Sequence, residues 1–380
     1  MVAHLIGGMP DLRDPETCPL LVVKLGSALL VGSDGEPRRE WLTGLIGELA
    51  AMHAAGQKIV IVSSGAIALG AAKLALPERG RRSLADAQAA ASVGQIALAR
   101  LWSEGLAQHG LIAAQMLLTL DDLEDRSRYL NASATLERLL EAGAVPVINE
   151  NDSVATEEIR FGDNDRLAAR VGQAAGADAV LLLSDVDGLY DRHPREEGAQ
   201  LVPVVAAMDD TIRAMATADT SSGLGSGGMV SKLQAADIAT RAGVALAIAN
   251  GTVEQPIGRA LGQGIGTLFR AQSGAGARKG WLGGRMAPMG TLRVDAGCAA
   301  ALGKGASLLA AGIVGVSGNF RRGDLVRICD LKGKALAQGL SEYAVHEVQA
   351  IAGKRAEDQA AQLGYAPRAA VIHRDHMVLL

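Results

Sequence analysis

Short apolar runs alternate with longer amphipathic stretches along the first 250 residues. The runs are rich in Val, Leu, Ile and Ala, and Gly, Asp, Asn or Ser bound most of them, which is typical of buried strands. They lie at 20–25, 58–64, 111–118, 145–150, 179–185 and 245–250. The amphipathic stretches predict helices near 40–54, 85–108, 126–141, 164–175 and 229–241. This alternation predicts an α/β fold, with an open, mainly parallel sheet sandwiched by helices.

The pattern changes after residue 270. The segment that follows is rich in Gly, Ala and basic residues and has no period, so it is interpreted as a linker. Beyond it, apolar segments at 291–295, 325–330 and 369–374 stand between Gly-containing turns and predict a small, mostly β domain. The predicted parts are an N-terminal extension (1–19), a first domain (20–270), the linker (271–289), a second domain (290–370) and a C-terminal tail (371–380).

Composition limits the class of protein. The 380 residues include 47 Gly but only ten aromatic residues, so the core must be aliphatic. Three distant Cys, no basic-then-apolar leader and no run of about 18 apolar residues favour a cytoplasmic protein without a membrane span. The net charge of −4 is uneven. The residues from 281 onward carry 12 basic and 8 acidic side chains, and the first 280 carry 25 and 33.

Polar residues follow the predicted strands where each strand ends. Lys24, Gly26 and Ser27 end the first strand region, and Ser63 and Ser64 end the second. Later strands end in Asn149–Asp152, Ser184–Asp185 and Asn250. Ligands of open α/β sheets bind at the carboxyl ends of the strands. We therefore expect a ligand site at this edge.

Two Gly-containing loops and a carboxylate cluster indicate the ligand. Ser63–Ala66 opens a predicted helix, and 223–228 leads into a helix that carries Lys232. Free N–H groups at such helix starts bind anions. The second segment fits a Rossmann fingerprint poorly because no strand precedes it, and no Walker A motif is present. The segment 161–166 has more carboxylates than a helix cap needs. Two lysines, anion-binding loops and carboxylates suit phosphoryl transfer, which depends on positioning and charge neutralisation.

Six segments together resemble the glutamate 5-kinases, a branch of the amino acid kinase family. They read VVKLGSALL, VSSGAIALG, VPVINENDSVAT, FGDNDRLAA, LLLSDVDGLY and GLGSGGMVSKLQAA, and the resemblance spans about residues 20–260. The segment RVDAGCAAALGKGASLLAAGIVGVSGNFRRGD and the terminal HRDHMV resemble the PUA domain appended to bacterial members. The resemblance implies an amino acid kinase fold followed by a small β-barrel-like PUA domain.

The resemblance also implies site residues. Lys24 and Lys232 would stabilise the transferring phosphoryl group, and Asp165 would organise both lysines. Ser64, Asp152 and Asn164 would bind glutamate, with Asp152 suited to its α-ammonium group. The implied nucleotide-binding residues are Lys24, Ser184, Asp185, Ser226, Gly227, Gly228, Met229, Val230, Ser231 and Lys232. Ala28 and His193 depart from the family pattern, in which a Ser or Thr and an Asp usually stand.

The implied reaction is attack of the L-glutamate γ-carboxylate on ATP, giving γ-glutamyl phosphate and ADP at the start of proline biosynthesis. Mg²⁺ would accompany the nucleotide, and no protein metal site is expected. The resemblance further implies proline as feedback inhibitor, a glutamyl-phosphate reductase as partner and a homo-oligomer.

Two alternatives remain at this stage. Another kinase of the same fold, such as acetylglutamate kinase, aspartokinase or UMP kinase, would share the motifs, but the PUA-like tail argues against all three. An RNA-binding protein would fit the basic tail, because PUA domains commonly bind RNA. Few rings are available there for stacking on bases, namely Trp281, Phe320, Tyr343 and Tyr365. Salt-dependent RNA affinity would favour this second alternative.

Overall fold

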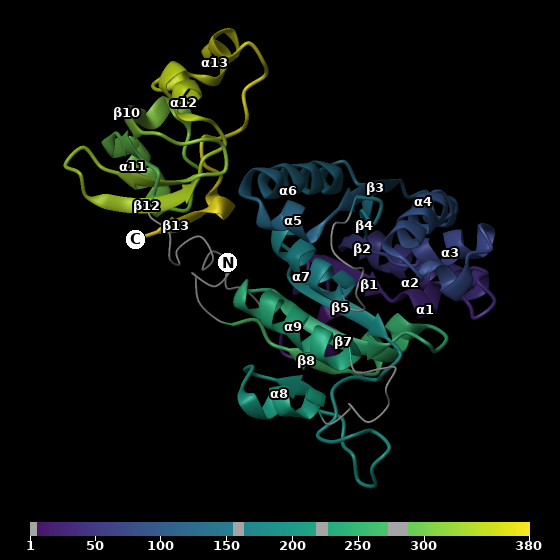
Figure 1. Cartoon of the computed structure of the whole chain (residues 1–380). Coiled ribbons are helices and arrows are strands. Elements are labelled where there is room, and N and C mark those ends of the chain that lie inside the picture. Colours follow the sequence, from purple (N-terminus) through teal and green to yellow (C-terminus); the bar gives the residue numbers. More distant parts are fainter. Residues whose placement is uncertain (1–5, 155–162, 218–226, 273–287) are drawn as a thin grey trace. The chain divides into compact units, whose positions relative to one another are not determined.

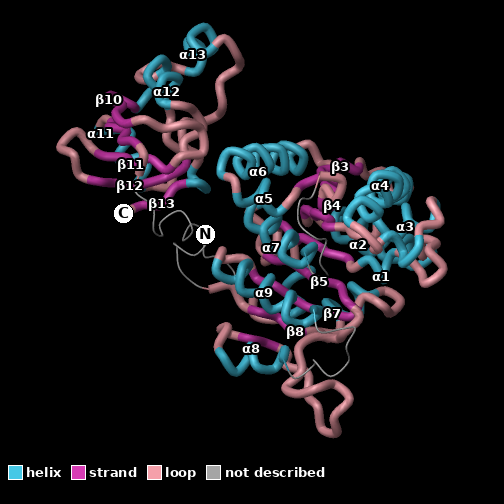
Figure 2. The backbone as a smooth tube through the Cα atoms, viewed as in Figure 1, coloured by secondary structure: helices cyan, strands magenta, loops and turns pink. Residues whose placement is uncertain are grey.

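The computed structural model describes residues 6–154, 163–217, 227–272 and 288–380. The chain forms two compact units (Figures 1 and 2). The first unit comprises Met1–Leu123 and Ala132–Gln272, and the second comprises Glu124–Asn131 and Ser273–Leu380. Among the described residues, no helix is long and apolar enough to cross a membrane.

An eight-stranded sheet forms the centre of the first unit. Its strand order is β3-β4-β2-β1-β5-β7-β8-β6, and all pairs are parallel except the antiparallel pair β7–β8. The strands are β1 (Leu20–Leu25), β2 (Lys58–Val62), β3 (Ala113–Leu118), β4 (Val145–Glu150), β5 (Ala179–Ser184), β6 (Val204–Val205), β7 (Ala245–Asn250) and β8 (Thr267–Phe269). Every residue of the central strands β1 and β5 is buried, as expected for a sheet covered on both faces. The predicted mainly parallel sheet is confirmed.

Helices cover both faces of this sheet (Figure 2). They are α1 (Ser27–Leu30), α2 (Arg39–Ala54), α3 (Ala66–Lys73), α4 (Leu84–Ala107), α5 (Leu120–Glu124), α6 (Arg126–Glu141), α7 (Asp163–Ala175), α8 (Asp210–Thr217) and α9 (Gly227–Arg241), with the short η1 (Met9–Arg13), η2 (Pro77–Gly80) and η3 (Gly258–Gly262). The five predicted helices match α2, α4, α6, α7 and α9 within two residues at each end. The helix predicted to open at Ser63–Ala66 is α3, whereas the short helix α1 was missed because its few apolar residues show too little periodicity.

Strand β1 sends alternate side chains to opposite faces of the sheet. Leu21, Val23 and Leu25 join the core cluster that includes residues of α2 and α4. Lys24 therefore points to the other face, where α7 and α9 lie. The two-residue period of β1 thus places Lys24, the one charged residue of this apolar strand, on the sheet face that α7 and α9 cover.

The predicted N-terminal extension contributes to the core of the first unit. Met9, Leu12 and Cys18 are buried in the same cluster as β1. The side-chain Nε2 of Gln57 donates to the carbonyl oxygens of Leu12 (2.8 Å) and Cys18 (2.6 Å). Residues 9–18 are therefore part of the domain. No sequence motif marked them, because their side chains pack in the core and do not belong to the candidate site.

Helices α3 and α4 approach each other so closely that only Gly fits at the crossing. A Cβ atom on Gly70 would lie 1.7 Å from the carbonyl oxygen of Ala90, and one on Gly94 would lie 1.7 Å from that of Ala66. Helix α3 begins two residues after Ser64, and α4 carries Gln95. The crossing therefore holds the start of α3 in place beside the sheet edge.

Gly94→Ala is expected to lower the free energy of unfolding by about 1–3 kcal/mol or more, because the added methyl group must push backbone atoms apart. Urea unfolding measures this loss. Gly44→Ala on α2 is the matched control, since nothing lies within 4 Å of its added Cβ. Alanine is a better helix former than glycine by about 0.8–1 kcal/mol, so Gly44→Ala should be neutral or stabilising. Equal effects of the two changes would contradict the steric explanation.

The second unit contains a five-stranded sheet with the order β10-β9-β11-β12-β13, in which only the pair β9–β11 is parallel. Its elements are β9 (Gly290–Val294), α11 (Ala296–Gly303), η4 (Ala310–Gly312), β10 (Ile313–Gly318), β11 (Leu325–Cys329), β12 (Ala335–Leu340), α12 (Val345–Ile351), α13 (Ala356–Leu363), η5 (Arg374–His376) and β13 (Met377–Leu379). Its apolar core is separate from that of the first unit. The predicted strands at 291–295 and 325–330 correspond to β9 and β11.

The strand predicted at 369–374 was wrong. Val371 and Ile372 are buried in the core, but the only pairing there is an isolated bridge between Ile372 and Leu308. The apolar side chains of this run are buried, but its backbone forms no ladder of strand hydrogen bonds. Hydrophobicity alone does not distinguish a buried loop from a buried strand. The segment predicted as a tail, 371–380, supplies these core residues and β13, so it is part of the folded unit.

The rings of the second unit are mostly unavailable for stacking. Phe320 and Tyr343 are each 1% exposed, whereas Tyr365 is 43% exposed. Trp281 lies outside the described residues. The described part of this unit thus offers one of the three counted rings to a nucleobase, which weakens the RNA-binding alternative.

Candidate active site

The carboxylate of Asp165 joins two lysines from different elements. Asp165 lies in the first turn of α7, and its Oδ1 is 2.5 Å from the Nζ of Lys24 at the end of β1. Its Oδ2 is 3.1 Å from the Nζ of Lys232 on α9. All three side chains are buried. The fold therefore brings together three residues that are more than 60 positions apart in sequence, as the predicted catalytic set requires.

The charges of this group depend on one another. Burial acts to raise the pKa of Asp165, but the positive charges and hydrogen bonds of Lys24 and Lys232 outweigh it and hold that pKa below its ordinary value. Burial lowers the pKa of the Lys24 ammonium, and the carboxylate of Asp165 opposes this shift. Asp165 is thus the counter-ion that opposes the loss of the Lys24 proton.

The start of α9 adds donors beside Asp165. The hydroxyl of Ser231 donates to Asp165 Oδ2 (3.2 Å) and also lies 3.1 Å from the carbonyl oxygen of Gly228. The Nζ of Lys232 lies 3.3 Å from that same carbonyl. Residues 227–232 therefore form the first turn of α9 around the end of Lys232. The free N–H groups of such a turn attract phosphate.

Ser184 and Asp185 follow β5, next to β1 in the sheet. The hydroxyl of Ser184 donates to the Asp185 carboxylate (3.0 Å), and the charge of Asp185 weakly opposes the lowering of the Lys24 pKa by burial. Met229 and Val230 are half-buried in the turn that precedes Lys232. Ser226, which the sequence also assigned to the nucleotide, lies outside the described residues.

Asn164 and Ser64 meet on the other side of Asp165. The Nδ2 of Asn164 donates to the hydroxyl of Ser64 (2.5 Å) and to the carbonyl oxygen of Ser63 (3.2 Å). Asp152, the third predicted substrate residue, is buried after β4. Burial lowers the pKa of Arg81, and the charge of Asp152 opposes that shift, so Arg81 lies near this carboxylate.

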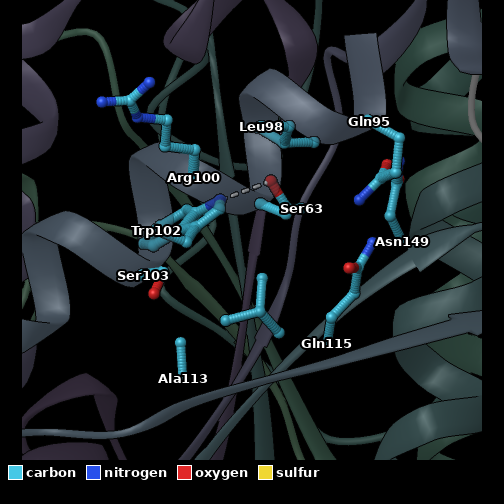
Figure 3. A pocket seen from close by; sticks show the side chains of 11 residues that line it. Ser63, Gln95, Leu98, Arg100, Trp102, Ser103, Ala113, Gln115 and Asn149 are labelled. Carbon is cyan, nitrogen blue, oxygen red and sulfur yellow. Dashed lines mark hydrogen bonds between the residues drawn. The ribbon is translucent and has the colours of Figure 1, made fainter. Parts of the chain in front are cut away.

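Two residues of α4 that no sequence motif marks contact the strand ends. Trp102 Nε1 donates to the hydroxyl of Ser63 (2.9 Å), and Gln95 Oε1 accepts from Asn149 Nδ2 (2.8 Å). Both line a cavity of about 310 Å³ between α4 and strands β2, β3 and β4 (Figure 3). The available signal was a polar residue, Gln95, within the apolar stripe formed by Ala91, Leu98 and Trp102.

The described residues contain no group of three or more His, Cys, Asp or Glu side chains arranged to hold a metal ion. Mg²⁺ usually binds through one or two carboxylates, substrate phosphates and water. A metal at this site would therefore take part of its ligands from a bound nucleotide.

Comparisons with known proteins agree with this geometry. The model of the amino acid kinase family matches residues 19–250, and that of the PUA domain matches residues 290–361. A glutamate 5-kinase of Novosphingobium aromaticivorans is 64% identical, with 99% of this chain and 100% of that protein covered. Those of Sphingopyxis alaskensis (97% and 100% covered) and Zymomonas mobilis (96% and 92%) are 58% and 54% identical.

These relatives decide between glutamate 5-kinase and the other kinases of the same fold that share its motifs. They share the kinase domain and, because they are covered almost completely, the C-terminal unit as well. The chain therefore belongs to the glutamate 5-kinases of the amino acid kinase family and carries a PUA domain at its C-terminal end.

Proposed function

We propose that the chain transfers the γ-phosphoryl group of ATP to the γ-carboxylate of L-glutamate, giving γ-glutamyl phosphate and ADP as the first step of proline biosynthesis. The observation that carries this proposal is the buried carboxylate of Asp165 between Lys24 and Lys232. Phosphoryl transfer needs cations on the transferring group, and these two are fixed before any substrate binds.

The proposed role of each residue follows from the element that carries it and from its contacts. Lys24 would contact the phosphoryl group from the end of β1, and Lys232 from the first turn of α9. Asp165 would hold both lysine side chains aimed at the same point. The turn formed by 227–232, with Ser184 and Asp185, would receive the phosphates of ATP. Mg²⁺ would neutralise part of the phosphate charge.

Ser64, Asp152 and Asn164 would bind the amino acid. Asp152 is a buried carboxylate and suits the α-ammonium group, while Ser64 and Asn164 adjoin the lysine pair through Asp165. Their place at the carboxyl edge supports an acceptor carboxylate held in line with the nucleotide.

Location, assembly, regulation and partner follow from the family. We propose a cytoplasmic enzyme that acts as a homo-oligomer, is inhibited by proline and passes its labile acyl phosphate to a glutamyl-phosphate reductase. These statements rest on the family alone.

An ADP-release assay tests the proposal. The acceptors are L-glutamate, aspartate, acetylglutamate, carbamate and UMP, each supplied with ATP and Mg²⁺. Turnover is expected with glutamate, and a hydroxylamine trap should capture the acyl phosphate. Turnover with one of the other acceptors and none with glutamate would contradict the proposal.

A further inference from the structure

A series of hydrogen bonds leads from α4 through Asn149 to the amide of Asn164. The donor and the acceptor are unambiguous at the Asn164 end. The Nδ2 of Asn164 lies 3.2 Å from the carbonyl oxygen of Ser63, which is only an acceptor. That end of the amide must therefore be the NH₂ group. Its Oδ1 is buried and has no hydrogen-bond partner within the described parts of the chain. A buried acceptor without a partner costs free energy unless a ligand supplies the donor.

The direction of the next amide follows from the first. The Oδ1 of Asn149 lies 3.5 Å from the Nδ2 of Asn164, so a donor faces an acceptor. If the Asn149 amide were reversed, two NH₂ groups would face each other. In the observed orientation Asn149 Nδ2 donates to Gln95 Oε1 at 2.8 Å (Figure 3). Gln95 is thus the residue that holds the Asn149 oxygen towards Asn164.

Helix α4 supports the same strand ends at a second point. Trp102 lies seven residues after Gln95, on the same side of α4, and its indole N–H donates to the hydroxyl of Ser63. Asn164 Nδ2 carries two hydrogens, and three acceptors lie near it. The Ser64 hydroxyl is 2.5 Å away, and the carbonyl of Ser63 (3.2 Å) and the oxygen of Asn149 (3.5 Å) share the remaining hydrogen. One rigid helix therefore positions both.

We propose that Gln95 is a positioning residue, which acts through Asn149 and reinforces the orientation in which Asn164 Oδ1 is a hydrogen-bond acceptor for the α-ammonium group of the bound amino acid. This inference rests on the proposed function, since it assigns a role within the same glutamate site. An oxygen suits an ammonium group, whereas an NH₂ group in its place would repel it. Asn164 would then share recognition of the ammonium group with Asp152 and favour amino acids over diacids that lack it.

The surroundings of Gln95 make the proposal testable. Gln95 borders the cavity of about 310 Å³, so a leucine of similar length has room there. Gln95→Leu removes the acceptor for Asn149, whereas Gln95→Glu presents only acceptors and should retain the bond. Gln108→Leu, the same change at the exposed C-cap of α4, is the matched control. Thermal melting of each variant checks the fold.

Steady-state kinetics supply the readout. Gln95→Leu is expected to raise KM for glutamate about 10-fold, an effect of the size of one hydrogen bond, with KM for ATP unchanged. Inhibition by glutarate, the five-carbon diacid without the α-ammonium group, should not change. Gln95→Glu and Gln108→Leu should both stay near the wild-type KM for glutamate.

Three results would overturn the inference. A wild-type KM for glutamate in Gln95→Leu would remove the positioning role. Equal weakening of glutamate and glutarate would show that the ammonium group is not what Asn164 recognises. A wild-type chain that is inactive with glutamate would overturn the proposed function and this inference together, whereas the first two results leave the proposed function intact.

Discussion

Replacing Lys232 with alanine is expected to lower kcat by about 10²–10³-fold and to leave the fold intact. This is the range observed when one preorganised donor to transition-state charge is removed. The expected size follows from the geometry, because Lys232 Nζ is held 3.1 Å from Asp165 and belongs to the turn assigned to phosphate. Asp165 would still be paired with Lys24, so no buried charge is left alone.

The measurement is initial-rate ADP release with saturating glutamate and ATP. Lys73→Ala serves as the matched control, since Lys73 is an exposed lysine at the end of α3. Circular dichroism melts should coincide for the wild type and both variants. A Lys232→Ala enzyme with full kcat would remove Lys232 from the catalytic group.

Asp165→Asn is expected to have the largest effect of any single change, because it leaves two buried ammonium groups without their common counter-ion. Removal of one partner from a buried ion pair typically lowers the free energy of unfolding by about 3–5 kcal/mol. Activity should fall further than in Lys232→Ala, since both cations lose their position at once. Urea unfolding and the ADP-release assay measure the two effects.

The stabilisation by Asp165 should depend on pH. The pKa of Asp165 is lowered in the folded state, so its stabilisation is present above the unfolded pKa of about 3.9 and is lost as pH falls through the folded pKa. The stability difference between wild type and Asp165→Asn should therefore be full at neutral pH and shrink in acid. A difference that stays constant down to pH 2 would contradict the ion-pair explanation.

The same variant should alter the alkaline side of the activity profile. Without Asp165 nothing comparable opposes the burial that lowers the pKa of Lys24, so Lys24 should lose its proton at a lower pH than in the wild type. Residual activity should then decline with rising pH earlier than wild-type activity does. Asp237→Asn, on the surface of α9 and paired with Arg241, is the control and should change stability by less than about 1 kcal/mol.

Much of the first unit could be predicted from sequence because buried parallel strands and amphipathic helices leave a strong periodic signal. Strand β1, for example, is apolar except for Lys24, and that exception marked the site. The second unit was predicted less well. Both β10 and β12 contain Gly, β10 has exposed positions and β12 has half-buried ones, whereas the buried run at 369–374 is not a ladder strand. In small β domains, burial and pairing are separate properties, and hydrophobicity reports only the first.

The sequence alone determined the fold class, because that depends on local periodicity, and the order of its motifs resembled the amino acid kinases closely enough to indicate the family. The tertiary structure decided which atoms meet. It placed Lys24, Asp165 and Lys232 in one buried group, and it put Gln95 of α4 behind Asn149. Contacts between residues so distant in the chain depend on how the helices cross the sheet. The direction of a side-chain amide hydrogen bond can be assigned only when its partner is known to be a donor or an acceptor. For that reason the carbonyl of Ser63 settles which end of the Asn164 amide is the NH₂ group.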